Sequence, residues 1–116
     1  MTWLDKFGKF IVENLRDKGI YFGERLLKNQ WNAPALQNIQ TELAKLSGSQ
    51  KEIVKQAIIS AFDSATHDFL FALQDRNDVQ ILVDGENVVR LSDGIHGEPY
   101  TEDGWYARFS KYKNIE

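Results

Sequence analysis

The spacing of apolar residues predicts helices over most of the first 75 positions. Within residues 2–18, aromatic and aliphatic side chains recur at the period of a helix with one apolar face. Thr2 is a suitable N-cap, and Asp5 follows three positions later, as in a capping box with a shorter acid. Lys18 and Gly19 form a C-terminal signal, because glycine readily adopts the left-handed conformation. The predicted apolar face comprises Trp3, Phe7, Phe10, Ile11 and Leu15.

Two shorter helices are predicted next. Residues 20–31 carry an apolar pattern that Gly23 interrupts. Asn32 can then cap a third helix, because asparagine is a favoured N-cap residue and Pro34 is tolerated in a first turn. The predicted buried face of this third helix comprises Leu36, Ile39, Leu43 and Leu46.

The longest regular pattern covers residues 50–74 and predicts the central helix of the domain. Ser49 and Glu52 match the capping-box pattern at its start. Several residues on its predicted apolar face are small, which would let a neighbouring helix approach closely. That face comprises Val54, Ala57, Ile58, Ala61, Phe62, Ala65, Phe69, Ala72 and Leu73.

The pattern then changes to that of a β-hairpin over residues 79–91. Two runs rich in β-branched residues, 79–83 and 88–91, flank Asp84 and Gly85, and an Asp-Gly pair is a strong hairpin turn signal. Two strands alone are marginal in water, so we expect the hairpin to pack on the helices. Its open edge could be covered, or could pair with a partner.

The chain is predicted to end with a Gly-rich acidic loop over 92–100 and a helix over 101–112. Thr101 caps this helix, and the two acids that follow it favour a helix N-terminus. We expect Trp105 and Phe109 to be buried, and we expect Tyr100 and Tyr106 to be exposed. The fold class is therefore α+β: a mostly helical single domain of four to five helices with one C-terminal β-hairpin.

Composition supports one folded domain. The chain has 116 residues, of which 42% are hydrophobic and 12% aromatic, enough to build a single core. It contains no cysteine, which excludes disulfides, thiolate metal sites and a cysteine nucleophile. The first ten residues include three charged ones, unlike a signal peptide, and no run is long enough to span a membrane. We therefore expect a cytoplasmic protein without a membrane partner.

Negative charge is concentrated near the C-terminus. Residues 84–104 contain six acids and one base, a net of −5, whereas the whole chain is −3, so the remaining residues sum to +2. A concentrated field of one sign favours cationic partners. The same balance argues against nucleic acid as a partner, because phosphates attract basic surfaces.

These features favour a non-catalytic protein-binding module that uses the acidic surface. No serine stands in a G-x-S-x-G elbow, and no phosphate-binding loop is present. We hypothesise an immunity or antitoxin-like protein that neutralises a basic toxin such as a nuclease, with no cofactor. Acidic side chains would imitate the phosphates that a nuclease groove attracts. The candidate binding residues are Asp93, His96, Glu98, Tyr100, Glu102, Asp103 and Tyr106.

Two alternatives remain open from the sequence. The first is a metal-binding protein or small metal-dependent hydrolase using Asp93, His96 and Glu98, joined by His67 if the C-terminal part of the chain packs near it. The spacing of these residues fits no established ligand motif. The second alternative is a structural subunit, such as a homodimer, that pairs through the edge of the hairpin.

Overall fold

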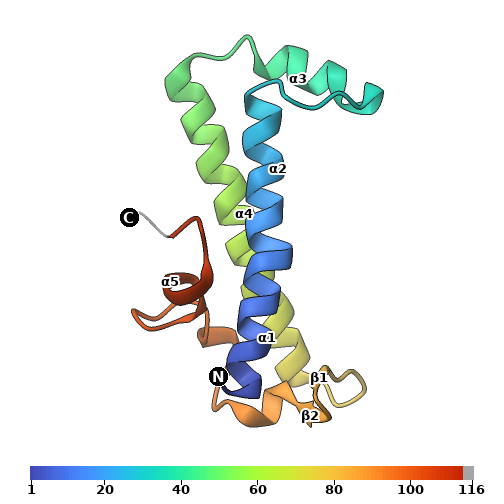
Figure 1. The fold of residues 1–116 in the computed structure, drawn as a ribbon, viewed down its shortest axis with the longest axis vertical. Coiled ribbons are helices and arrows are strands. Elements are labelled where there is room, and N and C mark those ends of the chain that lie inside the picture. The colour runs from blue at the N-terminus through green and yellow to red at the C-terminus, as the bar shows by residue number, and fades with distance from the viewer. Residues whose placement is uncertain (114–116) are drawn as a thin grey trace.

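The N-terminal part of the chain forms one continuous helical rod (Figure 1). The computed structural model describes residues 1–113. In it, α1 (Trp3–Ile11) continues through a π-helical segment, η1 (Val12–Arg16), into α2 (Asp17–Leu27). The Thr2 hydroxyl accepts a hydrogen bond from the Asp5 backbone N–H at 3.0 Å, so the predicted cap is confirmed. The predicted end at Lys18 and Gly19 is wrong.

Gly19 permits a close helix crossing instead of ending a helix. The long helix α4 (Gly48–Asp75) runs back along the rod. A Cβ at Gly19 would collide with the Phe62 ring, and one at Gly23 would lie 2.7 Å from Cδ1 of Ile58. These contacts also fix the antiparallel register of the two helices. Gly19 faces Phe62, whereas Gly23, four residues later in the chain, faces Ile58, four residues earlier.

A short helical connection joins the rod to α4. It comprises a 3-10 turn, η2 (Pro34–Leu36), and α3 (Gln37–Leu43). The predicted face is only half buried, and Ile39 is 47% exposed. The buried residue is Gln40, whose amide bonds the backbone N–H and C=O of Trp31 at 2.9 and 3.0 Å.

α4 begins earlier than predicted and buries only part of the predicted face. Its capping box pairs Ser47 with Gln50, two positions before the predicted pair. The fully buried positions are Thr66, Leu70 and Leu73. Five positions of the predicted face are exposed: Ala57, Ala61, Ala65, Phe69 and Ala72. The part of the predicted face that does pack includes Leu73 and the two residues that lie against the rod glycines, Ile58 and Phe62.

The hairpin is confirmed but is shorter than predicted. Strands β1 (Leu82–Val83) and β2 (Glu86–Asn87) pair antiparallel, with Leu82 opposite Asn87. Asp84 and Gly85 form the turn with φ of 50° and 86°, as a type I′ turn requires. The predicted second strand becomes a 3-10 helix, η3 (Val88–Leu91), because the Asn87 side chain accepts from the Val89 N–H at 3.0 Å and starts a turn.

The C-terminal helix is also shorter than predicted. After a 3-10 turn, η4 (Ile95–Gly97), and a further turn at 101–104, α5 covers only Trp105–Phe109. The helix ends at Ser110, where the backbone becomes extended. The reason is tertiary, because Ser110 and the next residues bond to the rod.

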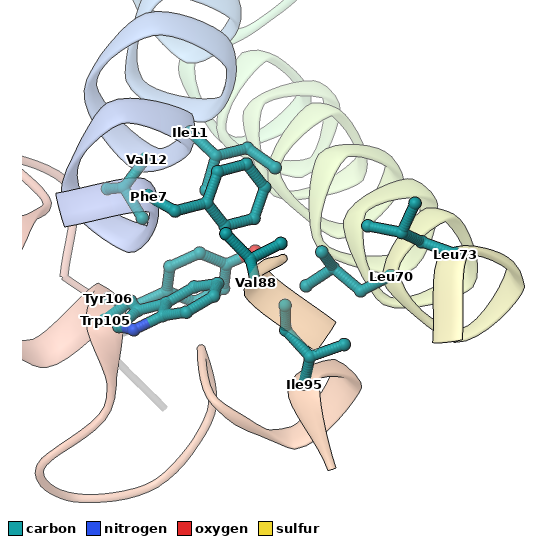
Figure 2. Close-up of a cluster of buried hydrophobic side chains, with 9 residues drawn as sticks. All are labelled: Phe7, Ile11, Val12, Leu70, Leu73, Val88, Ile95, Trp105 and Tyr106. Carbon is teal, nitrogen blue, oxygen red and sulfur yellow. The ribbon is translucent and has the colours of Figure 1, made fainter. Parts of the chain in front are cut away.

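The hydrophobic core lies between α1, the C-terminal half of α4 and the segments after it (Figure 2). Trp105 is fully buried, as predicted, and meets Phe7 edge-to-face with ring centroids 5.8 Å apart. Tyr106 was expected to be exposed, and the structure corrects this, since it is only 4% exposed. The cluster comprises Phe7, Ile11, Val12, Leu70, Leu73, Val88, Ile95, Trp105 and Tyr106.

A buried arginine joins the separate elements beside this core. Arg16 is 1% exposed. Its Nε donates to Asp63 of α4 at 2.6 Å, and its Nη1 donates to the Ser110 hydroxyl at 2.8 Å and to the Tyr112 carbonyl at 2.7 Å. Its guanidinium carbon lies 4.1 Å from the centroid of the Tyr106 ring. One side chain therefore connects the rod, α4 and the part of the chain after the hairpin, residues 95–113, which we call the C-terminal segment.

Asp17 completes this attachment of the C-terminal segment. Its carboxylate accepts from the Ser110 hydroxyl at 2.6 Å and from the Lys111 N–H at 2.8 Å. The Tyr112 hydroxyl donates to Glu24 at 2.8 Å. These bonds explain why α5 stops at Phe109: the backbone must extend along the rod to make them.

Residues 1–113 thus form a mostly helical domain of four helices, with the Trp3–Leu27 rod counted once, and a two-stranded antiparallel hairpin on the C-terminal side. The predicted fold class is confirmed. Among these residues, no helix combines the length and the apolar character that crossing a bilayer would require.

Replacing Arg16 by methionine should destabilise the fold strongly. The R16M change leaves Asp63 and Asp17 without their buried cation, and breaking a buried pair costs about 3–5 kcal/mol. Urea denaturation followed by tryptophan fluorescence measures the loss. The exposed Arg90 supplies a matched control, and R90M should change stability by less than about 0.5 kcal/mol. Similar losses in the two variants would contradict the role given to Arg16.

The ion pair between α1 and α5 should contribute stability only above acidic pH. Arg108 donates to Asp5 at 2.7 Å, and this hydrogen bond lowers the pKa of the Asp5 carboxyl. Because the folded pKa is depressed, the contribution is full above the unfolded value of about 4 and is lost as pH falls through the folded value. We expect D5N to cost about 0.5–1 kcal/mol at neutral pH, since the pair is partly exposed.

Denaturation of wild type and D5N across pH tests this prediction. The stability difference between the two proteins should disappear at strongly acidic pH. A difference that persisted there would show that the carboxylate charge is not the cause.

Candidate functional site: an aromatic patch beside acidic loops

One flank of α4 carries the first part of the site. His67, Phe71 and Gln74 are spaced by four and three residues, so they lie on the same side of the helix. The rings of His67 and Phe71 are nearly parallel, with centroids 6.4 Å apart. Phe71 is 50% exposed, although the preceding Leu70 is fully buried.

The loop after the hairpin brings His96 against this flank. The side-chain oxygen of Gln74 accepts from the Ile95 N–H and pairs with Nδ1 of His96, both at 3.1 Å. Because the backbone N–H fixes the orientation of the amide, Nδ1 of His96 must carry a proton to make its bond. Gln74 therefore anchors η4 to α4 and orients the imidazole.

Tyr100 extends the same surface. Its hydroxyl donates to the Asp63 carbonyl at 2.6 Å, and its ring centroid lies 6.1 Å from that of His67. Burial raises the pKa of Tyr100, with a contribution from the charge of Asp63, so its hydroxyl stays protonated and remains a donor at neutral pH. The buried Tyr106 packs edge-to-face behind it at 5.3 Å. Tyr106 thus supports Tyr100 and is not itself accessible to a partner.

Together these residues form the aromatic patch, defined as His67, Phe71, His96 and Tyr100. The His96 ring packs edge-to-face against His67 at 5.5 Å and against Phe71 at 5.4 Å. The structure thus brings together the two histidines of the chain. Such edge-to-face contacts add specific stabilisation and hold rings in place. His67, Phe71 and Tyr100 are exposed, and His96 is half-buried.

Acidic side chains lie on the loops next to the patch. Asp93, Glu102 and Asp103 are exposed, and no basic side chain within residues 1–113 forms an ion pair with them. Glu98 is half-buried and accepts from the Ser92 hydroxyl at 3.1 Å. The pKa of Arg108 is raised by its hydrogen bond to Asp5 and, to a smaller extent, by the negative charges of Glu98 and Asp103. We call Asp93, Glu98, Glu102 and Asp103 the acidic loops.

The acidic surface is smaller than the predicted segment. Asp84 lies at the hairpin turn and is paired with Lys6 at 2.7 Å, so it adds little net charge to the surface. The hydrogen bond from Lys6 lowers the pKa of the Asp84 carboxyl. The available negative charge is therefore concentrated over residues 93–103.

A tight turn of residues 98–104 carries three of these carboxylates, those of Glu98, Glu102 and Asp103, together with Tyr100. The N–H groups of Trp105 and Tyr106 donate to the carbonyls of Glu98 and Pro99 at 3.0 and 3.2 Å. A Cβ at Gly104 would lie 2.7 Å from the Glu98 carbonyl oxygen, so only glycine fits there. The start of α5 thereby fixes the shape of the acidic loops.

The metal-binding alternative lacks a suitable ligand set. Among residues 1–113, no group of three or more histidines and acids is arranged to hold a metal ion. Glu98 bonds to Ser92, whereas His96 bonds to Gln74. The Nδ1 atoms of His67 and His96 are also both engaged, with Asp68 at 3.2 Å and with Gln74 at 3.1 Å.

Comparisons with protein-family models, with curated proteins and with solved structures find no match to this chain.

The sequence identified only part of this site. Asp93, His96, Glu98, Tyr100, Glu102 and Asp103 were singled out because they lie in one acidic segment of the sequence, and of these His96 and Tyr100 both pack against the His67 ring. Phe71 and Gln74 were missed. A signal was present, since positions 67, 71 and 74 share one flank of the helix, but Phe71 was not distinguished from core aromatics.

Replacing Gly104 by alanine should loosen the acidic loops. The G104A Cβ would press on backbone atoms that cannot move aside, and overpacking of this kind costs about 1–3 kcal/mol. Denaturation measures the loss, and amide exchange at Trp105 and Tyr106 reports the local opening. Gly97 is the control, because a Cβ there meets nothing within 4 Å, so G97A should be neutral. Equal effects would contradict the close-packing argument.

Proposed function

We propose that this chain is a protein-binding module that recognises a basic partner through the aromatic patch and the acidic loops. One observation carries the proposal: four mutually packed rings, three of them exposed, stand next to carboxylates that form no ion pair with a basic side chain within residues 1–113. Rigid aromatic side chains are the residues that most often dominate binding energy at protein interfaces.

The two parts of the site would have different roles. Phe71 and Tyr100, 50% and 42% exposed, would bury apolar area on binding and set the lifetime of the complex. The acidic loops would attract a cationic surface and accelerate association, an effect that salt screens. His67 and His96 orient the two anchors and add polar edges.

A basic toxin, such as a nuclease, is the class of partner that fits best. Carboxylates at Asp93, Glu102 and Asp103 can take the positions that substrate phosphates occupy in a basic groove. The aromatic patch beside them then provides affinity that does not depend on charge. The module would act as an immunity or antitoxin-like inhibitor.

Titration with a synthetic peptide of alternating Arg and Trp residues tests the site by NMR. Shift changes should concentrate at the aromatic patch and the acidic loops. The F71A variant should weaken binding by about five- to thirtyfold, because it removes a central anchor. Phe69 is the matched control: it lies two positions away on α4 and is 49% exposed, and F69A should bind as wild type does.

A charge-reversed triple variant tests the second part of the site. D93K/E102K/D103K should weaken binding at least about tenfold at low salt and less at high salt. E13K/E42K/E52K changes the net charge equally, at exposed sites outside the acidic loops. Equal losses in the two triple variants, or salt-independent binding, would show that the acidic loops are not recognised.

A further inference from the structure

The helical rod carries a stripe of apolar residues that the fold leaves uncovered. Trp3, Phe10, Leu15 and Phe22 are 44%, 65%, 46% and 40% exposed. The predicted apolar face of the first helix is thus divided, because only Phe7 and Ile11 enter the core. At the N-terminal end of the rod the stripe adjoins a hollow of about 520 Å³, lined by Met1, Thr2, Trp3, Leu4 and Leu91.

The π-helical segment keeps this stripe straight. Trp3 to Phe10 and Leu15 to Phe22 are each seven residues, close to two α-helical turns. Phe10 to Leu15 is five residues and spans η1, where one turn is formed by i→i+5 bonds. In a regular α-helix Leu15 would be rotated out of line. The wide turn therefore places all four side chains along one side of the rod.

A second apolar stripe runs along α4. Ala61, Ala65, Phe69 and Ala72 are spaced by four, four and three residues, and all are exposed. Phe69 is the largest of them. Gly19 of the rod faces Phe62 of α4. Two turns from Phe62 toward the C-terminus of α4 lead to Phe69, and two turns from Gly19 toward the N-terminus of the rod lead to η1. Phe69 is therefore level with Phe10 and Leu15.

Both stripes face away from the C-terminal segment. On the rod, that segment contacts Gly8 and Arg16, and on α4 it contacts Asp63 and Gln74. The exposed stripes lie on the opposite flanks of the two helices, as helical spacing requires. They form one continuous surface, which we call the rod face.

The size of the rod face matches what a homodimer needs. A whole aromatic side chain can bury about 150–250 Å². Multiplying areas of this size by the exposed fractions gives a total exposed area of about 500 Å² for Trp3, Phe10, Leu15, Phe22 and Phe69. A standard interface buries about 800 Å² per partner, of which about 65% is apolar in homodimers. The two apolar areas agree.

Charge also favours a second copy on this face. Each chain has a net charge of −3, so the acidic loops of two copies would repel each other. The apolar residues of the rod face are uncharged, and the exposed charged residues that share their flanks are of opposite sign, Lys18 on the rod and Asp68 on α4, so contact between two copies need not bring only like charges together. We propose that two copies associate through the rod face to form a four-helix core from two rods and two α4 helices.

This inference does not depend on the proposed function, because it uses the opposite side of the molecule. It also replaces the hairpin edge as the dimer contact, since each strand is only two residues long. Sedimentation equilibrium at concentrations up to about 100 μM should give the mass of a dimer. F69D should raise the dimer dissociation constant about thirtyfold or more, because it places a charge in the apolar interface.

The matched control is F71D, which places the same charge two residues away on the other flank of α4. F71D should remain a dimer, and the far-ultraviolet circular dichroism of both variants should match that of wild type. A monomeric wild type, or equal dissociation of both variants, would overturn the proposal. So would a monomer that sediments with anionic lipid vesicles and loses that property in F69D, since the rod face would then bind lipid.

Discussion

The structure depends on one buried cation. Arg16 joins the rod to α4 through Asp63 and to the C-terminal segment through Ser110 and Tyr112. Each of these elements has its own apolar contacts, but apolar packing alone does not specify how three elements are placed relative to one another. A planar guanidinium with directional donors does, because Nε and Nη1 reach their three acceptors in one arrangement only. The shape of both candidate surfaces follows from that arrangement.

α4 separates those two surfaces. Phe69 and Phe71 are equally exposed and only two positions apart, yet one belongs to the rod face and the other to the aromatic patch. The C-terminal segment covers just one flank of the helix, and it brings His96, Tyr100 and the acidic loops with it. A charged recognition surface and an uncharged association surface can therefore coexist on a single helix. Binding on one side need not compete with binding on the other.

Local patterns predicted which elements form but not how far they extend or which way they face. The cap at Thr2, the hairpin turn at Asp84 and Gly85, and the burial of Trp105 all follow from short-range chemistry. The fusion of the first two helices does not, because Gly19 is a stop signal in isolation and a contact point once Phe62 lies against it. Nor does the early end of α5, which depends on bonds from Ser110 to the distant Arg16.

The same limitation explains the candidate site. Six of its residues are contiguous enough to be seen as one acidic segment, whereas Phe71 is distinguished only by what lies beside it in space. Tyr106 shows the converse, since its spacing suggested a solvent-facing tyrosine and the Arg16 guanidinium lies over its ring instead. Separating a binding aromatic from a core aromatic required the tertiary arrangement.

The sequence separation of the Arg16 contacts has a consequence for biosynthesis. Arg16 and Ser110 are 94 positions apart, so the arginine leaves the ribosome long before its hydroxyl and carbonyl acceptors exist. Until then the nascent chain can pair Arg16 with Asp63 of α4 but cannot enclose the guanidinium. Closure of the fold must therefore await the emergence of residues 110–112, and a chain truncated before them would expose the core to chaperones and proteases.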